Sequence, residues 1–149
     1  MVDESGKLEQ PGETIFAYAN DRSRVIRLKA RDRDACMQQL PGRRFQKTLR
    51  IFAACLFLLL KDIVRVSTIC KIVIDNEYTK HDRDIKTLLL TLLEQHQIAY
   101  PSGLITVENL SKKNPADQIA GRVRDRTRHA DETITATQVL AVLSRRKRP

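Results

Sequence analysis

Residues 68–77 have the sequence Thr-Ile-Cys-Lys-Ile-Val-Ile-Asp-Asn-Glu, and this stretch decides the fold class. Its first seven residues, Thr68–Ile74, are β-branched and continuous, which is typical of a strand covered on both faces in the middle of a sheet. Downstream, apolar residues at helical spacing predict a helix from about Asp82 to His96, and Leu104–Leu110 predicts a second strand. A strand, a helix and a strand in that order predict a parallel crossover and therefore an α/β sheet.

The residues before this strand predict a hairpin and the largest helix of the domain. Thr14–Ala19 and Arg24–Ala30 are expected to form a β-hairpin around a turn-forming Asn-Asp-Arg-Ser segment, and the first forty residues are expected to be extended. Between Arg43 and about Ile63, apolar residues recur every three to four positions, and residues 51–60 are apolar throughout. This pattern predicts a long helix that is buried on most faces.

The C-terminal third of the chain predicts two further helices. Asn114 is a favourable N-cap and Pro115 a favourable first helical residue, so a helix is expected to begin there. A last helix is expected over about Thr133–Leu143. Together these elements predict one domain over residues 1–143, followed by a flexible basic tail over 144–149.

The composition indicates the environment and the partners of the protein. The chain has 149 residues and a formal charge of +9, which favours polyanionic partners such as nucleic acid or an anionic membrane face. Its three cysteines form no Cys-x-x-Cys pair and lie in or beside apolar segments, so we expect buried, reduced thiols and a cytoplasmic protein. The longest apolar run has only ten residues, from which we expect neither secretion nor a membrane span.

Three short acidic segments are candidates for a divalent-metal site. Asp75 is expected at the carboxyl end of a strand, where ligands bind in open α/β sheets, and Glu77 is the next candidate ligand. Turn chemistry explains an Asp-Asn pair after a strand equally well, and Asp82 is expected to cap the following helix. Asp117 lies in the first turn of a predicted helix, where the helix dipole alone would favour an acid.

Asp3 and Glu4 form the third segment, which is close to the start of the sequence. Acidic termini are usually frayed and without function. The alternative is that these residues end a short first strand, for which only Met1 and Val2 are available. If Asp3, Asp75 and Asp117 converge, each pair at ~5 Å repels by ~3 kcal/mol at an effective dielectric constant near 20, and a cation or raised pKa values must offset this repulsion.

The acidic segments also carry a family resemblance. Val2–Gly6 contains Asp-Glu-Ser-Gly, Ile72–Asp75 is a middle strand that ends in Asp, and Ser111–Gly121 contains Ser-Lys followed by Ala-Asp-x-x-Ala-Gly. In this order and spacing the chain resembles an RNase H-like family of unknown function, over residues 2 to about 125. The resemblance implies a mixed sheet with helices on its faces.

The same resemblance implies a site for phosphodiester hydrolysis with Mg²⁺ or Mn²⁺, in which two cations can clamp the attacking and leaving oxygens. It implies that Asp3, Asp75 and Asp117 are the catalytic metal ligands, with Glu4 and Glu77 as possible supplements. The function expected from it is a metal-dependent nuclease, or a nuclease-like domain, that acts on DNA or RNA.

A non-catalytic module that keeps the fold and binds nucleic acid is the alternative function. The candidate contacts to nucleic acid are the basic residues that flank Asp117, namely Lys112, Lys113, Arg122, Arg124, Arg126 and Arg128. Three Tyr, four Phe and no Trp argue against a single-strand platform built on base stacking. His81 follows Asp75 by six residues and could reach a bound phosphate or accept a proton, although an isolated histidine is more often a surface residue.

Overall fold

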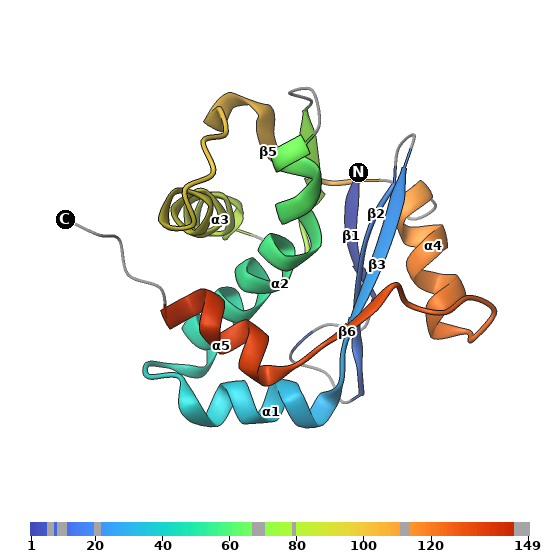
Figure 1. Cartoon of the computed structure of the whole chain (residues 1–149), viewed down its shortest axis with the longest axis horizontal. Helices are drawn as coiled ribbons and strands as arrows, with labels where there is room; N and C mark the ends of the chain where they lie inside the picture. The colour runs from blue at the N-terminus through green and yellow to red at the C-terminus, as the bar shows by residue number, and fades with distance from the viewer. Residues whose placement is uncertain are drawn as a thin grey trace.

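Two apolar layers, one on each face of a mixed sheet, define the architecture of the chain (Figure 1). The structure is a computed structural model that describes residues 1–5, 8, 12–19, 22–66, 71–78, 80–110 and 114–144. Within these residues six strands form one sheet in the order β5-β4-β1-β2-β3-β6. The chain is therefore a single α/β domain with a mixed sheet, which confirms the predicted fold class at this level.

The sheet combines an antiparallel meander with parallel additions on both sides. Its strands are β1 (Val2–Ser5), β2 (Thr14–Ala19), β3 (Ser23–Leu28), β4 (Ile72–Asp75), β5 (Ile105–Glu108) and β6 (Glu132–Ile134). β1, β2 and β3 pair antiparallel, which confirms the predicted hairpin. β4 lies parallel to β1, β5 lies parallel to β4, and β6 lies parallel to β3. The predicted parallel crossover from β4 to β5 is thus confirmed.

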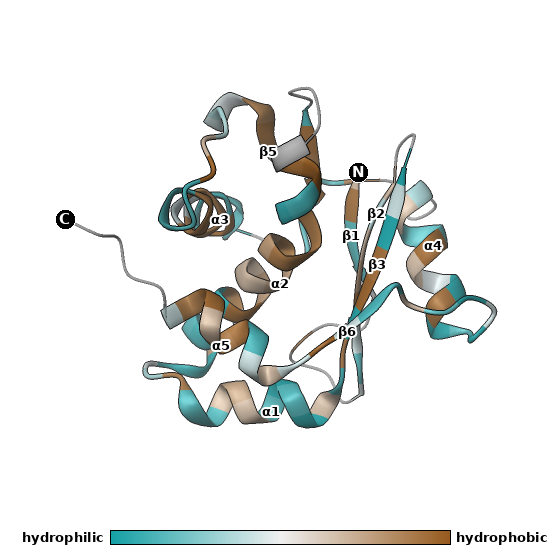
Figure 2. Cartoon of the chain, viewed as in Figure 1, coloured by the Kyte–Doolittle hydropathy of each residue, from teal (hydrophilic) through white to brown (hydrophobic). Residues whose placement is uncertain are grey.

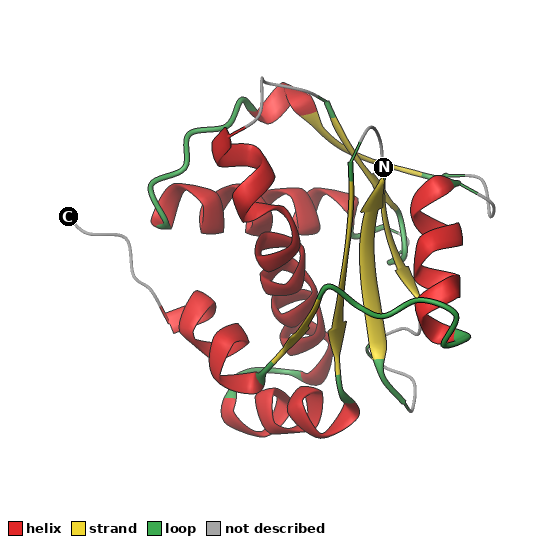
Figure 3. Ribbon diagram, turned by 45° about the vertical axis from the view of Figure 1, so that its right-hand side comes forward, coloured by secondary structure: helices red, strands yellow, loops and turns green. Residues whose placement is uncertain are grey.

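Five α-helices surround the sheet within the described part of the chain. They are α1 (Ala30–Gln39), α2 (Arg44–Val66), α3 (Asp82–Gln95), α4 (Pro115–Arg124) and α5 (Ala136–Ser144), with a 3-10 turn at Ser102–Leu104 before β5. Figure 3 shows α4 on one side of the sheet and the other helices on the opposite side. Among the described helices none is long and apolar enough to cross a membrane.

α2 forms the centre of the larger apolar layer. Every residue from Ile51 to Leu60 is buried, and the hydropathy colouring of Figure 2 shows the middle of this helix as largely hydrophobic. The helix is covered on one side by the sheet and on the others by α1, α3 and α5. This environment explains why a helix with an all-round apolar segment is stable in a protein of this charge.

The second layer, between the sheet and α4, is thinner and consists mainly of small side chains. Ala17 and Ala19 of β2 meet Ala116 and Ala120 of α4, and Val123 completes the contact. Small residues at both surfaces allow the helix to approach the sheet closely. Asn114, which caps α4, is thereby brought over the strands of the meander.

The predictions for two segments are wrong: one helix was expected to be extended, and one strand was expected to be the start of a helix. Ala30–Gln39 is helical instead of extended; Arg33 and Cys36 are its buried residues, so its apolar periodicity is too weak to see in the sequence. Glu132–Ile134 is a strand instead of the start of the last helix, because it pairs with β3 and has β-branched residues.

The first and middle strands also differ from the prediction. β1 extends through Ser5, so Asp3 and Glu4 lie within a paired strand and are not beyond its end. β4 begins at Ile72, and the predicted strand residues 68–70 lie outside the described residues. The residue at the N-cap position of α3 is His81, and Asp82 belongs to the first turn, where the helix dipole favours an acid.

The described cysteines are buried and reduced, as the sequence predicts. Cys36 and Cys55 are free thiols in the larger apolar layer, and Cys70 lies outside the described residues. Burial, together with the charge of Asp32, raises the pKa of the Cys36 thiol to about 11. Burial is also the main reason why the pKa of Cys55 is raised, followed by the charge of Glu4. Both thiols are therefore neutral and unreactive at physiological pH.

The packing of α2 predicts a large difference between two phenylalanines of the same helix. Phe52 is 1% exposed and contacts the rings of Phe16 and Tyr78, whereas Phe45 is 39% exposed. We expect Phe52→Ala to lower the free energy of unfolding by ~3–5 kcal/mol in urea denaturation, and Phe45→Ala to lower it by less than ~1 kcal/mol. Similar losses in the two variants would contradict this assignment of the core.

Candidate metal centre

The register of the parallel pair β1 and β4 determines which acids can meet. Val2 pairs with Ile74, and both side chains are buried in the larger apolar layer beside α2. Successive side chains of a strand point to opposite faces, so Asp3 and Asp75, the next residues of the two strands, both point to the α4 face. Two acids from distant parts of the sequence therefore lie side by side on adjacent strands.

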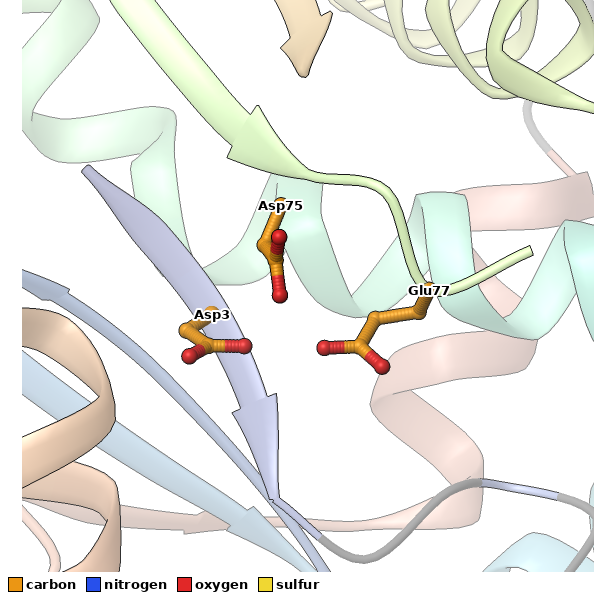
Figure 4. Close-up of side chains that lie close together, drawn as sticks. All are labelled: Asp3, Asp75 and Glu77. Atoms are coloured by element: carbon orange, nitrogen blue, oxygen red, sulfur yellow. The ribbon is translucent and has the colours of Figure 1, made fainter. Parts of the chain in front are cut away.

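Glu77 completes the group from the loop that follows β4. Figure 4 shows the three carboxyl groups directed toward a common space, with Asp3 on β1, Asp75 at the end of β4 and Glu77 beyond it. One carboxylate oxygen from each residue lies within 4.8 Å of the others. This cluster is buried at Asp3, which is 6% exposed, and partly accessible at Asp75 and Glu77. We call these three residues the acidic cluster.

Hydrogen bonds fix the two aspartates of the acidic cluster. The backbone amide of Glu4 donates to Asp3 Oδ1 at 2.7 Å, and Asn114 Nδ2 donates to Asp3 Oδ2 at 3.3 Å. The backbone amide of Leu110 donates to Asp75 Oδ1 at 2.9 Å. The two aspartates therefore stand on strands, with one donor from β1 itself and two from the residues that follow β5.

The proximity of the three acids changes their protonation. Burial, and then hydrogen bonds with Asp3 and Asp75 and their negative charge, raise the pKa of Glu77 to about 9. Burial also raises the pKa of Asp3, and the charge of Asp75 adds to the effect, whereas its hydrogen bonds act in the opposite direction. Glu77 is therefore protonated near neutral pH.

Of the other predicted ligands, neither Glu4 nor Asp117 belongs to the acidic cluster. Glu4 is buried on the opposite face of β1, where its charge acts on Cys55 of α2. Asp117 lies in the first turn of α4, and its backbone amide donates to Asn114 Oδ1 at 2.9 Å, which confirms the predicted cap. The structure thus brings together Asp3, Asp75 and Glu77, and connects Asp117 to them only through Asn114.

Two residues near the site were not predicted from the sequence. Asn114 was expected only as a helix cap, but its side chain bridges the N-terminus of α4 and Asp3. Glu108 pairs in register with Asp75 on the adjacent strand, yet its carboxylate accepts from Thr106 and forms an ion pair with Lys71. These interactions lower the pKa of Glu108, which lies at the surface. Nothing in the local sequence distinguishes Glu108 from Glu77.

The predicted basic contacts surround α4 but are only partly described. Arg122, Arg124 and Arg126 are exposed at or just after the C-terminal end of this helix. Arg124 Nε lies 3.7 Å from Asp125 Oδ1, and Arg128 Nη2 lies 3.7 Å from Asp131 Oδ2. Lys112 and Lys113 lie outside the described residues. Arg122 and Arg124 of α4 therefore lie on the same side of the sheet as the acidic cluster.

Comparison with known proteins gives no assignment: the chain matches no protein family, no curated protein and no solved structure. The function has to be inferred from the fold and from the chemistry of the acidic cluster.

The raised pKa of Glu77 predicts a pH-dependent stability. Folded Glu77 holds a proton up to a pH of about 9, whereas in the unfolded chain it loses that proton near its ordinary value of 4.5. Its contribution to stability is therefore complete below pH 4.5 and is lost as the pH rises toward 9. In EDTA, we expect Glu77→Gln to melt at a higher temperature than the wild type at pH 8–9, and the difference to shrink toward pH 5. A pH-independent difference would refute the coupling.

The two roles of Asn114 can be separated by two substitutions. Asn114→Ser keeps a cap for α4 but removes the amide that donates to Asp3, whereas Asn114→Ala removes both. We expect only Asn114→Ala to lose the ~1 kcal/mol that a cap contributes to the free energy of unfolding. Both variants should weaken Mn²⁺ binding by ~10–100-fold in calorimetric titration. Unchanged Mn²⁺ affinity in Asn114→Ser would show that the amide does not orient Asp3.

Proposed function

We propose that the chain is an RNase H-like, metal-dependent nuclease whose acidic cluster hydrolyses phosphodiester bonds in nucleic acid. The convergence of Asp3, Asp75 and Glu77 from two strands and a loop is the observation that supports this function. The mixed sheet with helices on both faces is consistent with the fold that the sequence resemblance implies.

The donor set of the acidic cluster fits a hard divalent cation. Carboxylate oxygens are the ligands that Mg²⁺ and Mn²⁺ prefer. Oxygens bound to one Mg²⁺ at 2.0–2.1 Å are at most about 4.2 Å apart, so a cluster within 4.8 Å needs only small side-chain movements. Three ionised carboxylates at this spacing repel by ~10 kcal/mol in total at an effective dielectric constant near 20, which a cation would offset. Such a cation would polarise the phosphate and activate the attacking water.

The chain's own residues have separable roles in this proposal. Asp3 and Asp75 would hold the cation on rigid strands, because backbone and side-chain donors already fix their carboxyl groups. Glu77 lies on the loop after β4 and would complete the site, where binding of a cation would favour loss of its proton. Arg122, Arg124 and Arg126 would bind phosphates of the substrate on the same side of the sheet.

A non-catalytic nucleic-acid-binding module is the second candidate function. The exposed arginines around α4 and the formal charge of +9 favour it, because phosphate binding requires no cation in the acidic cluster. This candidate predicts binding that weakens steeply with salt and is insensitive to divalent metals.

The test is cleavage of labelled single-stranded, duplex and hybrid nucleic acids with Mg²⁺ or Mn²⁺. We expect Asp75→Asn to reduce the rate at least ~100-fold, as for loss of one electrostatic group that acts in the transition state. Glu108→Gln is the matched control, since this acid pairs with Asp75 in the sheet but lies outside the acidic cluster. Its rate should remain within ~3-fold of the wild type.

Two results would count against the nuclease. Equal cleavage by the wild type and Asp75→Asn would indicate a contaminating activity. No cleavage of any substrate, together with salt-sensitive binding that Asp75→Asn retains, would favour the non-catalytic module.

A further inference from the structure

A pair of rings, exposed Phe45 and half-buried His81, lies beside the loop that carries Glu77. Phe45, in the first turn of α2, and Met1 are the exposed large hydrophobic residues in the described part of the chain. The Phe45 ring lies 4.5 Å from the ring of His81, with an angle of 58° between the two planes. His81 Nδ1 is 3.0 Å from Asp84 Oδ2, which holds the imidazole in place. The acidic-cluster function does not use either ring.

The position of Phe45 is fixed by the core. Its ring packs edge-on against Tyr78 at 6.3 Å, and Tyr78 packs against Phe52 at 5.1 Å. Tyr78 is buried and directly follows Glu77 in the chain. A series of aromatic contacts therefore leads from the core to Phe45 through Tyr78, the residue that follows Glu77.

A groove of about 450 Å³ lies between α2 and α3 beside this pair. Its lining includes Gln46, the neighbour of Phe45, and Asp84, the partner of His81; the other lining residues are Pro41, Leu49, Arg50, Thr87 and Leu88. The volume lies within the range of small-ligand sites, and the lining combines apolar surface with a few polar groups. Amide, hydroxyl, carboxylate and guanidinium groups together can pair with the polar edge of a planar heterocycle.

Three arginines near the start of α2 lie in or close to the groove. Arg50 lines it, and Arg43 and Arg44 flank Phe45 in sequence. None of these three arginines forms an ion pair with another described residue. They are therefore available to phosphates on either side of a ligand held in the groove.

We propose that an unpaired nucleobase of the substrate strand stacks on the exposed ring of Phe45 at the rim of this groove, while the adjacent phosphates contact the arginines at the start of α2. The substrate class is then nucleic acid with at least one unpaired base. This inference deepens the proposed nuclease function and rests on it for the identity of the bound strand. The site is a single stacking position, which is compatible with the low aromatic content of the chain.

The test measures binding of labelled oligonucleotides in EDTA by fluorescence anisotropy, so that no cleavage occurs. We expect a single strand to bind more tightly than a blunt duplex of the same sequence. Phe45→Ala should weaken single-strand binding by roughly 5- to 150-fold, as for the loss of one base stack. Phe45→Leu should remain weak although it keeps an apolar side chain, and Phe45→Trp should restore the affinity.

Two further measurements distinguish stacking of a base within a strand from binding of a free nucleotide. A single strand with abasic positions should lose the dependence on Phe45, and a free mononucleotide should compete only weakly, since it lacks the neighbouring phosphates. A mononucleotide that binds as tightly as the strand would overturn the proposal, as would equal binding of the strand by wild type and Phe45→Ala.

The outcome is distinguishable from that of the proposed function. If the protein cleaves no nucleic acid with Mg²⁺ or Mn²⁺ but still shows Phe45-dependent binding of single strands, the nuclease fails and the stacking site stands. If it cleaves in an Asp75-dependent manner and Phe45→Ala changes neither binding nor the preference for unpaired strands, the stacking site fails and the nuclease stands.

Discussion

The parallel pairing of β1 with β4 is the constraint on which the site depends. Val2 and Ile74 are both buried against α2, so the register buries two apolar side chains and at the same time places Asp3 and Asp75 on the other face. A shift by one residue would move an acid into the apolar layer and an apolar side chain out of it. The packing of Val2 and Ile74 in the core therefore determines where the carboxylates of Asp3 and Asp75 lie, although these apolar side chains take no part in the chemistry of the site.

The electrostatic repulsion among the three carboxyl groups of the acidic cluster is reduced by the residues around them. Backbone amides and Asn114 donate to the aspartates, and Glu77 retains a proton. The α4 layer contributes because its alanines allow the helix cap to approach β1. The three acids are thus held close together because donors and a retained proton offset their repulsion.

The sequence predicted those parts of the fold whose local pattern and tertiary environment agree. α2, α3, the hairpin and the crossover have strong periodicity or β-branched runs, and Asp75 follows directly from its place at a strand end. The predictions for α1 and β6 were wrong, because α1 buries too few apolar residues to show a periodicity and β6 is short and depends on its pairing with β3. Asn114 as a partner of Asp3 was not predictable, since this contact spans 111 residues and depends on how closely α4 approaches the sheet.

The long separation of the paired elements also has a consequence for how the chain acquires its site. β1 is followed immediately by its antiparallel partners, whereas its parallel partner β4 comes after two helices, and Asn114 comes later still. During synthesis, the meander can form early, but Asp3 remains without its neighbours until most of the chain has emerged. Contacts of such high sequence separation form slowly, so the acidic cluster should be among the last features to assemble. A partly folded chain would therefore contain much of the sheet before its three carboxyl groups meet.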